Sequence, residues 1–186
     1  MASTLIYGRE EAVLTDPGMT FDQARALGDW VAEKGKNLTD IFVTHGHRDH
    51  WFAAGILAER FGARVVAGAG TIAEMGCNVA MRPLLWGKVY PGLIPPSPVT
   101  AVPVPDNRFT VEGHDLVIVE VGPTDAVDST VLHVRDLALR RRRCELQRRA
   151  QVPRPGRACR RLRAVAGGDR QGRGVAAAAD RRRSSE

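Results

Sequence analysis

Four side chains of types that bind metal ions lie within a span of six residues, in the motif Thr44-His45-Gly46-His47-Arg48-Asp49-His50. Two neutral imidazoles on one ion, with a carboxylate and a third imidazole directed toward a neighbouring ion, suit Zn²⁺, which accepts nitrogen and oxygen donors. Such a cluster can activate a water molecule. The motif therefore predicts a site for one or two zinc ions. The predicted ligands are His45, His47, Asp49 and His50.

The residues on either side of the motif predict a strand that leads into a helix. The apolar run Ile41-Phe42-Val43 indicates the strand. His45 and His47 are two residues apart, so in an extended segment both side chains point to the same side. Residues 50–60 are expected to form a helix that stops at Phe61-Gly62.

Strands and helices alternate through residues 1–139, which we interpret as one α/β domain. Thr20 is expected to cap a helix, and Trp51 and Phe52 are expected to pack at the start of the helix after the motif. Residues 70–98 predict a helix followed by a loop rich in Pro and Gly. The other predicted strands are 11–15, 64–67, 102–104, 108–111, 116–121 and 129–134.

The composition favours a cytoplasmic protein. The 186 residues, 44% of them hydrophobic, include no apolar run of the ~18 residues that would indicate a transmembrane helix. The N-terminus lacks a basic region followed by an apolar stretch long enough for a secretory signal. The three cysteines are scattered and odd in number, which argues against a disulfide framework.

The charge changes abruptly after residue 139. Residues 1–139 hold 11 Lys and Arg and 17 Asp and Glu, whereas residues 140–186 hold 16 Arg and four acids. The last 47 residues also contain no Phe, Trp, Tyr or Ile. Such a segment cannot bury enough apolar area to offset its ordering entropy, so residues 140–186 are predicted to be a disordered, Arg-rich tail.

A reading-frame shift in the gene is our interpretation of this tail. Arginine codons that begin with CG, read one base later, begin with G and encode Val, Ala, Gly or Asp. In that frame residues 140–155 can encode a stretch containing Ala-Gly-Asp, and residues 157–175 can encode Phe, Trp, Leu and Ile at helical spacing. The alternative is a genuine basic tail that binds nucleic acid, although it has no aromatic residues for base stacking.

The pattern His-x-His-x-Asp-His at residues 45–50, after an apolar strand and Thr44, resembles the metallo-β-lactamase fold hydrolases. The resemblance covers roughly residues 3–139 and implies an αββα sandwich that holds one or two metal ions, usually zinc. It implies that His45 and His47 hold the first ion and that Asp49 and His50 hold the second. Asp49 would also orient the nucleophilic water, and the substrate would be a small lactam, thioester, lactone or other ester.

Other positions match the family unevenly. Asp16 matches an acidic residue that supports the site, and its alternative role is that of a turn or cap residue. Residues 122–130 resemble the motif Gly-His-Thr-x-x-x-x-Ser/Thr, but Pro123 replaces the histidine that is the third ligand of the first metal. The late Asp and His of the family are not visible. His114, His133 and Asp169 are left unassigned.

This ligand set is incomplete, because a catalytic zinc ion normally has three protein ligands and each predicted ion has two. The sequence therefore predicts a partial αββα domain over residues 1–139 that binds metal weakly, is poorly soluble and is nearly inactive. Two other interpretations stay open: a non-catalytic metal-binding scaffold on the same fold, and a nucleic-acid-binding protein that acts through residues 140–186.

Overall fold

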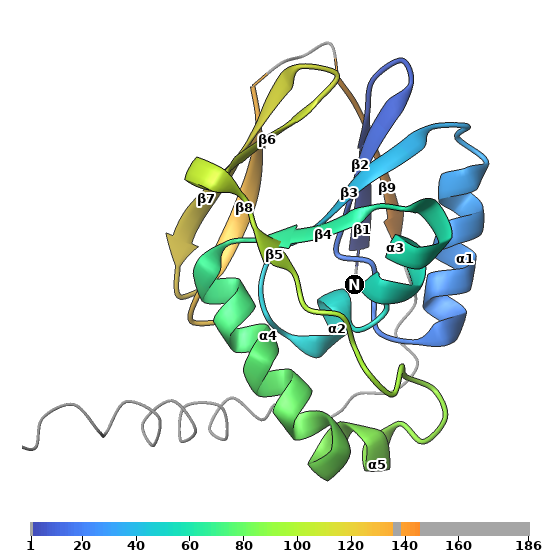
Figure 1. The fold of residues 1–186 in the computed structure, drawn as a ribbon, viewed down its shortest axis with the longest axis vertical. Helices are drawn as coiled ribbons and strands as arrows, with labels where there is room; N and C mark the ends of the chain where they lie inside the picture. Colours follow the sequence, from blue (N-terminus) through green and yellow to red (C-terminus); the bar gives the residue numbers. More distant parts are fainter. Residues whose placement is uncertain (1, 136–138, 146–186) are drawn as a thin grey trace, which may run out of the picture. The chain divides into compact units, whose positions relative to one another are not determined.

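The computed structural model describes residues 2–135 and 139–145, which form two β-sheets and the helices α1 to α5 (Figure 1). The larger sheet has the strand order β5-β4-β3-β2-β1-β9, and the smaller sheet has the order β6-β7-β8. The strands are β1 Ala2–Tyr7, β2 Glu11–Thr15, β3 Asn37–Val43, β4 Arg64–Ala67, β5 Val102–Pro103, β6 Arg108–Val111, β7 His114–Gly122, β8 Ser129–Val134 and β9 Arg140–Glu145. The helices are α1 Phe21–Ala32, α2 Arg48–Trp51, α3 Ala54–Phe61, α4 Ala69–Met81 and α5 Gly87–Val89, with a π-helical turn Arg82–Trp86 and a 3-10 turn Pro105–Asn107.

Helical crossovers account for the parallel half of the larger sheet. β2, β3, β4 and β5 pair in parallel, and each connection between them contains a helix, as parallel neighbours require. β1 is antiparallel to both of its neighbours. The four residues that end β3, from Asp40 to Val43, are all buried, so the metal-binding motif begins from the rigid centre of the sheet.

Side chains of the larger sheet alternate between two hydrophobic cores. Ile6, Val13, Phe42 and Val66 pack in one core with residues of the smaller sheet such as Phe109, Leu116 and Ile118. Their neighbours Leu5, Leu14, Ile41 and Val65 pack in the other core with residues of the helices such as Leu27, Leu57 and Met75. The period of two therefore produces three layers: helices, larger sheet and smaller sheet (Figure 1).

These layers correspond to three of the four in the predicted αββα sandwich. On the far side of the smaller sheet the cross-strand pair Val119 and Val131 is exposed, and so is Val121. In an αββα sandwich this face carries the second helical layer. The described residues thus form the partial sandwich that was predicted, with an apolar sheet face in contact with solvent.

The helix after Thr20 forms as predicted. The Thr20 hydroxyl accepts a hydrogen bond from the Gln23 N–H at 3.2 Å, and the Gln23 side chain accepts one from the Thr20 N–H at 3.2 Å. This capping box satisfies two donors that the helix itself leaves unpaired. None of the helices in the described part of the chain is long and apolar enough to cross a membrane.

The single helix predicted over residues 50–60 is wrong in detail. The structure has two helices, α2 and α3, separated at Phe52 and Ala53. The Ala53 N–H donates to the Gly18 carbonyl at 3.0 Å, so a tertiary contact takes the donor that a continuous helix would use. The predicted end is confirmed, since Gly62 caps α3 with a positive φ of 69°.

Two strands at the edge of the larger sheet were not predicted. β1 was missed because its apolar run, Leu5-Ile6-Tyr7, is only three residues long. The predicted disordered tail begins too early, because the backbone of Arg140–Glu145 pairs with β1 along its whole length, from Tyr7 opposite Arg140 to Ala2 opposite Glu145. An open strand edge offers backbone donors and acceptors whatever the side chains are, so composition alone was a poor guide here. The rest of the predicted tail, residues 146–186, lies outside the described residues.

Candidate metal centre

The first residue of the motif, Thr44, is held by two other elements. Its backbone N–H and its hydroxyl each lie 2.9 Å from an oxygen of the Asp16 carboxylate. Its carbonyl accepts hydrogen bonds from the Thr130 backbone N–H at 2.8 Å and from the Thr130 hydroxyl at 2.7 Å. Asp16 directly follows β2 and Thr130 lies in β8, so both sheets fix the point where the motif leaves β3.

The middle of the motif is held at Gly46. The Gly46 carbonyl accepts hydrogen bonds from Trp51 Nε1 at 3.0 Å and from Asn78 Nδ2 at 2.9 Å. A Cβ atom on Gly46 would lie only 2.5 Å from the Cβ atom of Glu74, so this position must be glycine. Trp51 and Phe52 are completely buried, which confirms that they pack at the start of the helix.

These contacts bring two of the four predicted ligands together with a residue that was not predicted. Donor atoms of His45, His47 and Asp125 all lie within 4.8 Å of one another. Asp125 Oδ2 is 3.3 Å from His47 Nδ1 and 3.6 Å from His45 Nε2. Two imidazoles and one carboxylate form an established ligand set for a divalent metal ion.

Asp125 is presented by a loop whose shape comes from its own hydrogen bonds. The Thr124 N–H donates to the Ala126 carbonyl at 3.0 Å. The Thr124 hydroxyl donates to Ser129 Oγ at 2.7 Å, and the Ser129 hydroxyl donates to the Ala126 carbonyl at 3.2 Å. Pro123 lies in this loop and offers no ligand atom. Asp125 is two residues after Pro123, so the loop places a carboxylate beside His45 and His47 in the segment where the family motif has its histidine.

The other two predicted ligands, Asp49 and His50, are not part of this group of three. His50 lies beside it, with its ring centroid 3.9 Å from that of His45. His50 Nδ1 faces Asp16 Oδ2 at 3.2 Å. Asp49 lies in the first turn of α2 and is half-buried. His50 therefore lies next to the group, and neither it nor Asp49 completes a second set of three donors among the described residues.

Asp16 connects the motif to both His45 and His50. It has a positive φ of 48°, which is uncommon outside glycine, and it is buried. Besides its contact with His50, it accepts the Thr44 hydroxyl, whose oxygen lies 3.0 Å from His45 Nδ1. Because the Thr44 hydroxyl donates its hydrogen bond to Asp16, its oxygen accepts one from His45 Nδ1–H. The lone pair of the His45 ring is then on Nε2. Asp16 thus acts both as the turn residue after β2 and as a partner of the motif.

The surroundings of His45 fit a metal ligand. Burial, followed by the charge of His50, lowers the pKa of His45 to about 4, so its imidazole is neutral at neutral pH and can donate a lone pair. His45 Nε2 is buried without a hydrogen-bond partner, which is costly unless another group satisfies it. Burial also lowers the pKa of His50, but the hydrogen bond and charge of Asp16 outweigh it and raise the pKa above its ordinary value. A divalent cation among His45, His47 and Asp125 would satisfy the Nε2 atom.

Comparison with known families identifies this fold and motif. The model of the metallo-beta-lactamase superfamily matches residues 2–140. The chain belongs to the metallo-beta-lactamase superfamily. The match contains the strands β1 to β8, the helices and the motif segment, and the family is the one predicted from the His-x-His-x-Asp-His pattern. No match was found among the curated proteins.

Solved metallo-beta-lactamase structures share the fold of this chain at low sequence identity. A metallo-beta-lactamase from Cronobacter sakazakii with a HARLDQ motif is 21% identical and has a TM-score of 0.54, over 70% of this chain and 51% of that one. A metallo-beta-lactamase family protein from Thermus thermophilus is 22% identical with a TM-score of 0.52, over 71% and 50%. A subclass B3 enzyme from a soil metagenome library is 19% identical with a TM-score of 0.52, over 70% and 49%. The chain thus spans about half the length of these structures.

The three residues that the sequence analysis left unassigned are not part of the group His45, His47 and Asp125. His114 begins β7 opposite Val111, directly after the hairpin turn between β6 and β7. The turn itself is Glu112-Gly113, both with positive φ, as a two-residue hairpin requires. His133 lies in β8, and Asp169 lies outside the described residues. The sequence signal that could have identified Asp125 was its position two residues after the proline.

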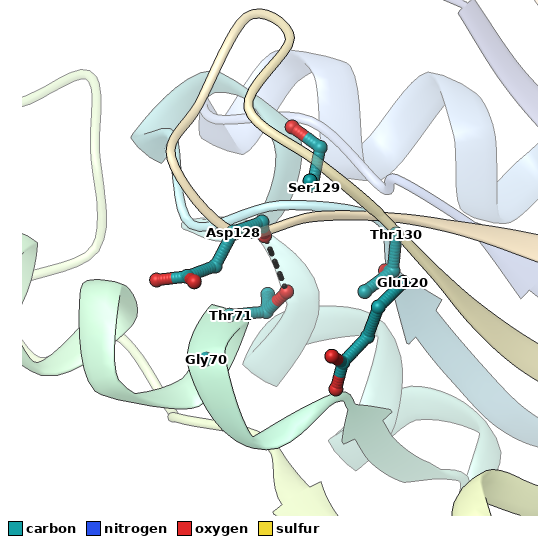
Figure 2. A pocket seen from close by; sticks show the side chains of 7 residues that line it. Gly70, Thr71, Glu120, Asp128, Ser129 and Thr130 are labelled. Atoms are coloured by element: carbon teal, nitrogen blue, oxygen red, sulfur yellow. Dashed lines mark hydrogen bonds between the residues drawn. The ribbon is translucent and has the colours of Figure 1, made fainter.

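A small polar cavity of about 220 Å³ lies beside the Asp125 loop (Figure 2). It is formed by the first turn of α4 together with the end of β7 and the start of β8. The Thr71 hydroxyl donates to the Asp128 carbonyl at 3.2 Å and closes one side of it. The lining residues are Gly70, Thr71, Glu120, Gly122, Asp128, Ser129 and Thr130.

Proposed function

We propose that this chain is a metal-dependent hydrolase by descent, with one complete metal site formed by His45, His47 and Asp125. The observation that carries the proposal is the convergence of these three donors within 4.8 Å, with His45 neutral and its Nε2 atom buried without a hydrogen bond. Zn²⁺ is the ion we propose, because imidazole and carboxylate donors both suit it. Asp125 is the third ligand that we propose, beside the two that the sequence predicted for this ion.

A second ion would have His50 and Asp49 as ligands. With Nδ1–H directed at Asp16, His50 would present its Nε2 lone pair, as metal-binding histidines commonly do. Two protein ligands are fewer than a stable zinc site needs. We therefore propose that the second site is weak, and that the chain binds one ion tightly rather than two.

The residues around the site have separate roles in the proposed hydrolysis. A bound ion would lower the pKa of a water molecule and polarise the substrate carbonyl. Asp49 would orient the water and accept its proton. Asp16 would hold Thr44 and His50 and keep the imidazoles of His45 and His50 in the tautomers that leave Nε2 free. These roles use contacts that exist before any substrate binds.

The proposed substrate is a small molecule with a lactam, thioester, lactone or other ester bond, in a protein that we place in the cytoplasm. The cavity beside the Asp125 loop would hold a polar substituent of the substrate, since hydroxyl and carboxyl groups line it. Its volume of about 220 Å³ fits a substituent rather than a whole drug-sized molecule.

Zinc content and hydrolysis of a chromogenic β-lactam, a thioester and a lactone test the proposal. The wild-type chain should contain about one zinc ion per chain and hydrolyse at least one of the substrates slowly. The variant Asp125→Ala should lose both properties, whereas Asp22→Asn, an exposed carboxylate on α1, should keep them. A wild-type chain without zinc and without turnover would refute the proposal.

We also propose that the segment after residue 139 arises from a shift of reading frame. Three observations support this: the change in composition at this point, the end of the family match at residue 140, and the span of about half the length of the solved structures. The test is to resequence the gene around the codons for Leu139 and Arg140. An unbroken frame there would overturn the proposal and leave a genuine basic tail.

A further inference from the structure

Helix α4 packs directly on the metal-binding motif through residues that the motif itself does not predict. Glu74 and Asn78 are four residues apart and lie on the same face of α4. Asn78 donates to the Gly46 carbonyl at 2.9 Å. In the π-helical turn that follows α4, the Trp86 ring lies 3.8 Å from the Arg48 guanidinium carbon. The motif is therefore held by side chains of α4 and by one of the π-helical turn that follows it.

The Glu74 side chain packs closely against the backbone of Gly46. The position of a Cβ atom on Gly46 lies 2.5 Å from Glu74 Cβ, 2.6 Å from Cγ and 3.0 Å from Cδ, so the aliphatic part of Glu74 runs across the Gly46 backbone. The Glu74 side chain is only 14% exposed. A carboxylate this far from water needs polar partners to offset its desolvation.

The carboxylate of Glu74 meets the side of His47 that faces away from Asp125. Glu74 Oε1 lies 3.7 Å from His47 Nε2, and Asp125 Oδ2 lies 3.3 Å from His47 Nδ1. The His47 ring is thus placed between two carboxylates, one on each ring nitrogen. Nδ1 is the ring nitrogen on the side of Asp125, and Nε2 is the one on the side of Glu74.

We propose that Glu74 is a positioning residue for the metal site: it accepts a hydrogen bond from His47 Nε2–H and thereby presents the Nδ1 lone pair to the ion. This inference rests on the proposed function, because it assigns the partner of one of the ligands of that site. A hydrogen bond at 3.2 Å requires an approach of roughly 0.5 Å, and such bonds commonly tighten when a site is loaded. The requirement for glycine at position 46 then has a functional reason, since any side chain there would displace Glu74.

Two substitutions separate hydrogen bonding from packing. Glu74→Gln keeps the length of the side chain and an acceptor oxygen, whereas Glu74→Leu keeps apolar packing on Gly46 but removes the acceptor. A partner that orients a metal-binding histidine typically contributes about 10–100-fold to metal affinity, so Glu74→Leu should bind zinc weaker by that factor and Glu74→Gln by less. Glu59→Leu, at an exposed glutamate of α3, is the matched control and should bind zinc as the wild type does.

The experiment is zinc titration of the full chain and these three variants, with ¹⁵N NMR of the histidine rings in the zinc-bound wild type. The proposal expects the order of affinities given above, and a His47 ring with metal on Nδ1 and a proton on Nε2. If the wild type binds zinc and Glu74→Leu binds it equally well, or if the zinc is on Nε2, the role of Glu74 is refuted and the proposed function stands. If the wild type binds no zinc, the proposed function and the role of Glu74 are both refuted.

Discussion

The two sides of the candidate metal centre are built in different ways. His45 and His47 belong to a segment that is fixed by Asp16, Thr130 and α4, with most of its hydrogen bonds buried or partly buried. Asp125 belongs to an exposed loop whose hydrogen bonds are mainly internal to residues 124–129. The imidazoles are therefore positioned by the whole domain, and the carboxylate is positioned by its own loop.

This difference teaches how a chain can lose a family ligand and keep a site. In the proposed site the histidine segment would define where the ion lies, and a nearby loop that directs a donor toward that point would complete the set. A loop that depends on its own hydrogen bonds can shift a donor by two residues without disturbing the sheets. The predictions below test whether the histidine segment dominates the site and whether Asp125 completes it.

The largest effect is expected from His45→Ala. Removing a buried imidazole leaves the ion with His47 and Asp125 alone, which is below the three protein ligands of a typical site. Stoichiometric zinc binding should be lost, as measured by metal analysis after gel filtration. His133→Ala, at an exposed histidine of β8, should retain its zinc. Full zinc content in His45→Ala would show that the ion lies elsewhere.

The next effect is expected from Asp125→Ala and its rescue. Residues that only support a ligand typically contribute about 10–100-fold to metal affinity. The loss of zinc affinity in this variant should be larger than that. Adding Pro123→His to Asp125→Ala supplies an imidazole from the same loop and should restore part of the affinity. Affinity in the double variant no better than in Asp125→Ala would mean that the loop cannot deliver a ligand from position 123.

A smaller effect is expected from Asp16→Asn. The amide can accept the Thr44 hydroxyl through one oxygen but carries no charge for His50, so both contacts weaken. Because Asp16 supports the imidazoles without joining the group of three, zinc affinity should fall by about 10–100-fold. Competition with a zinc-sensitive dye measures this change. An unchanged affinity would reduce Asp16 to a turn residue.

The smallest effect on the metal site is expected from Glu112→Gln, which should change the pH dependence of the stability of the fold. Hydrogen bonds from the backbone N–H groups of Glu11, Glu10 and Arg9 lower the pKa of Glu112 from 4.5 to about 2. A depressed folded-state pKa contributes stability above pH 4.5 that is lost as the pH falls toward 2. Thermal unfolding of the variant should therefore depend less on pH between about 5 and 2, with zinc affinity at neutral pH unchanged. The same acid dependence in both proteins would contradict this.

Local patterns in the sequence were sufficient for most of the central fold. The helix capped by Thr20, the end of α3 at Gly62 and the strands β2 to β8 follow from capping, glycine placement and apolar runs. The elements that were missed or misplaced depend on partners that are distant in sequence. β9 needs the free edge of β1, and the break between α2 and α3 needs the Gly18 carbonyl.

The residues of the candidate site could likewise be predicted where a local pattern marks them, and not where distant parts of the chain bring them together. His45 and His47 were recognisable because their spacing alone places them together, and Asp16 because it ends a strand. Glu74 carries no such local signal, and Asp125 carries a weak one, its position two residues after Pro123. Asp125 is brought to the histidines by the β7–β8 connection, and Glu74 by the packing of α4 on Gly46. Neither arrangement can be read from neighbouring residues.

The stoichiometry of zinc binding tests the central claim most directly. The claim is that the site of the first ion has a complete set of ligands and that the site of the second ion does not. Zinc would be titrated into the metal-free full chain by calorimetry, with Asp125→Ala measured in parallel. The account predicts one tightly bound ion per chain, and its loss in the variant. Two tightly bound ions, or one ion held equally well without Asp125, would contradict it.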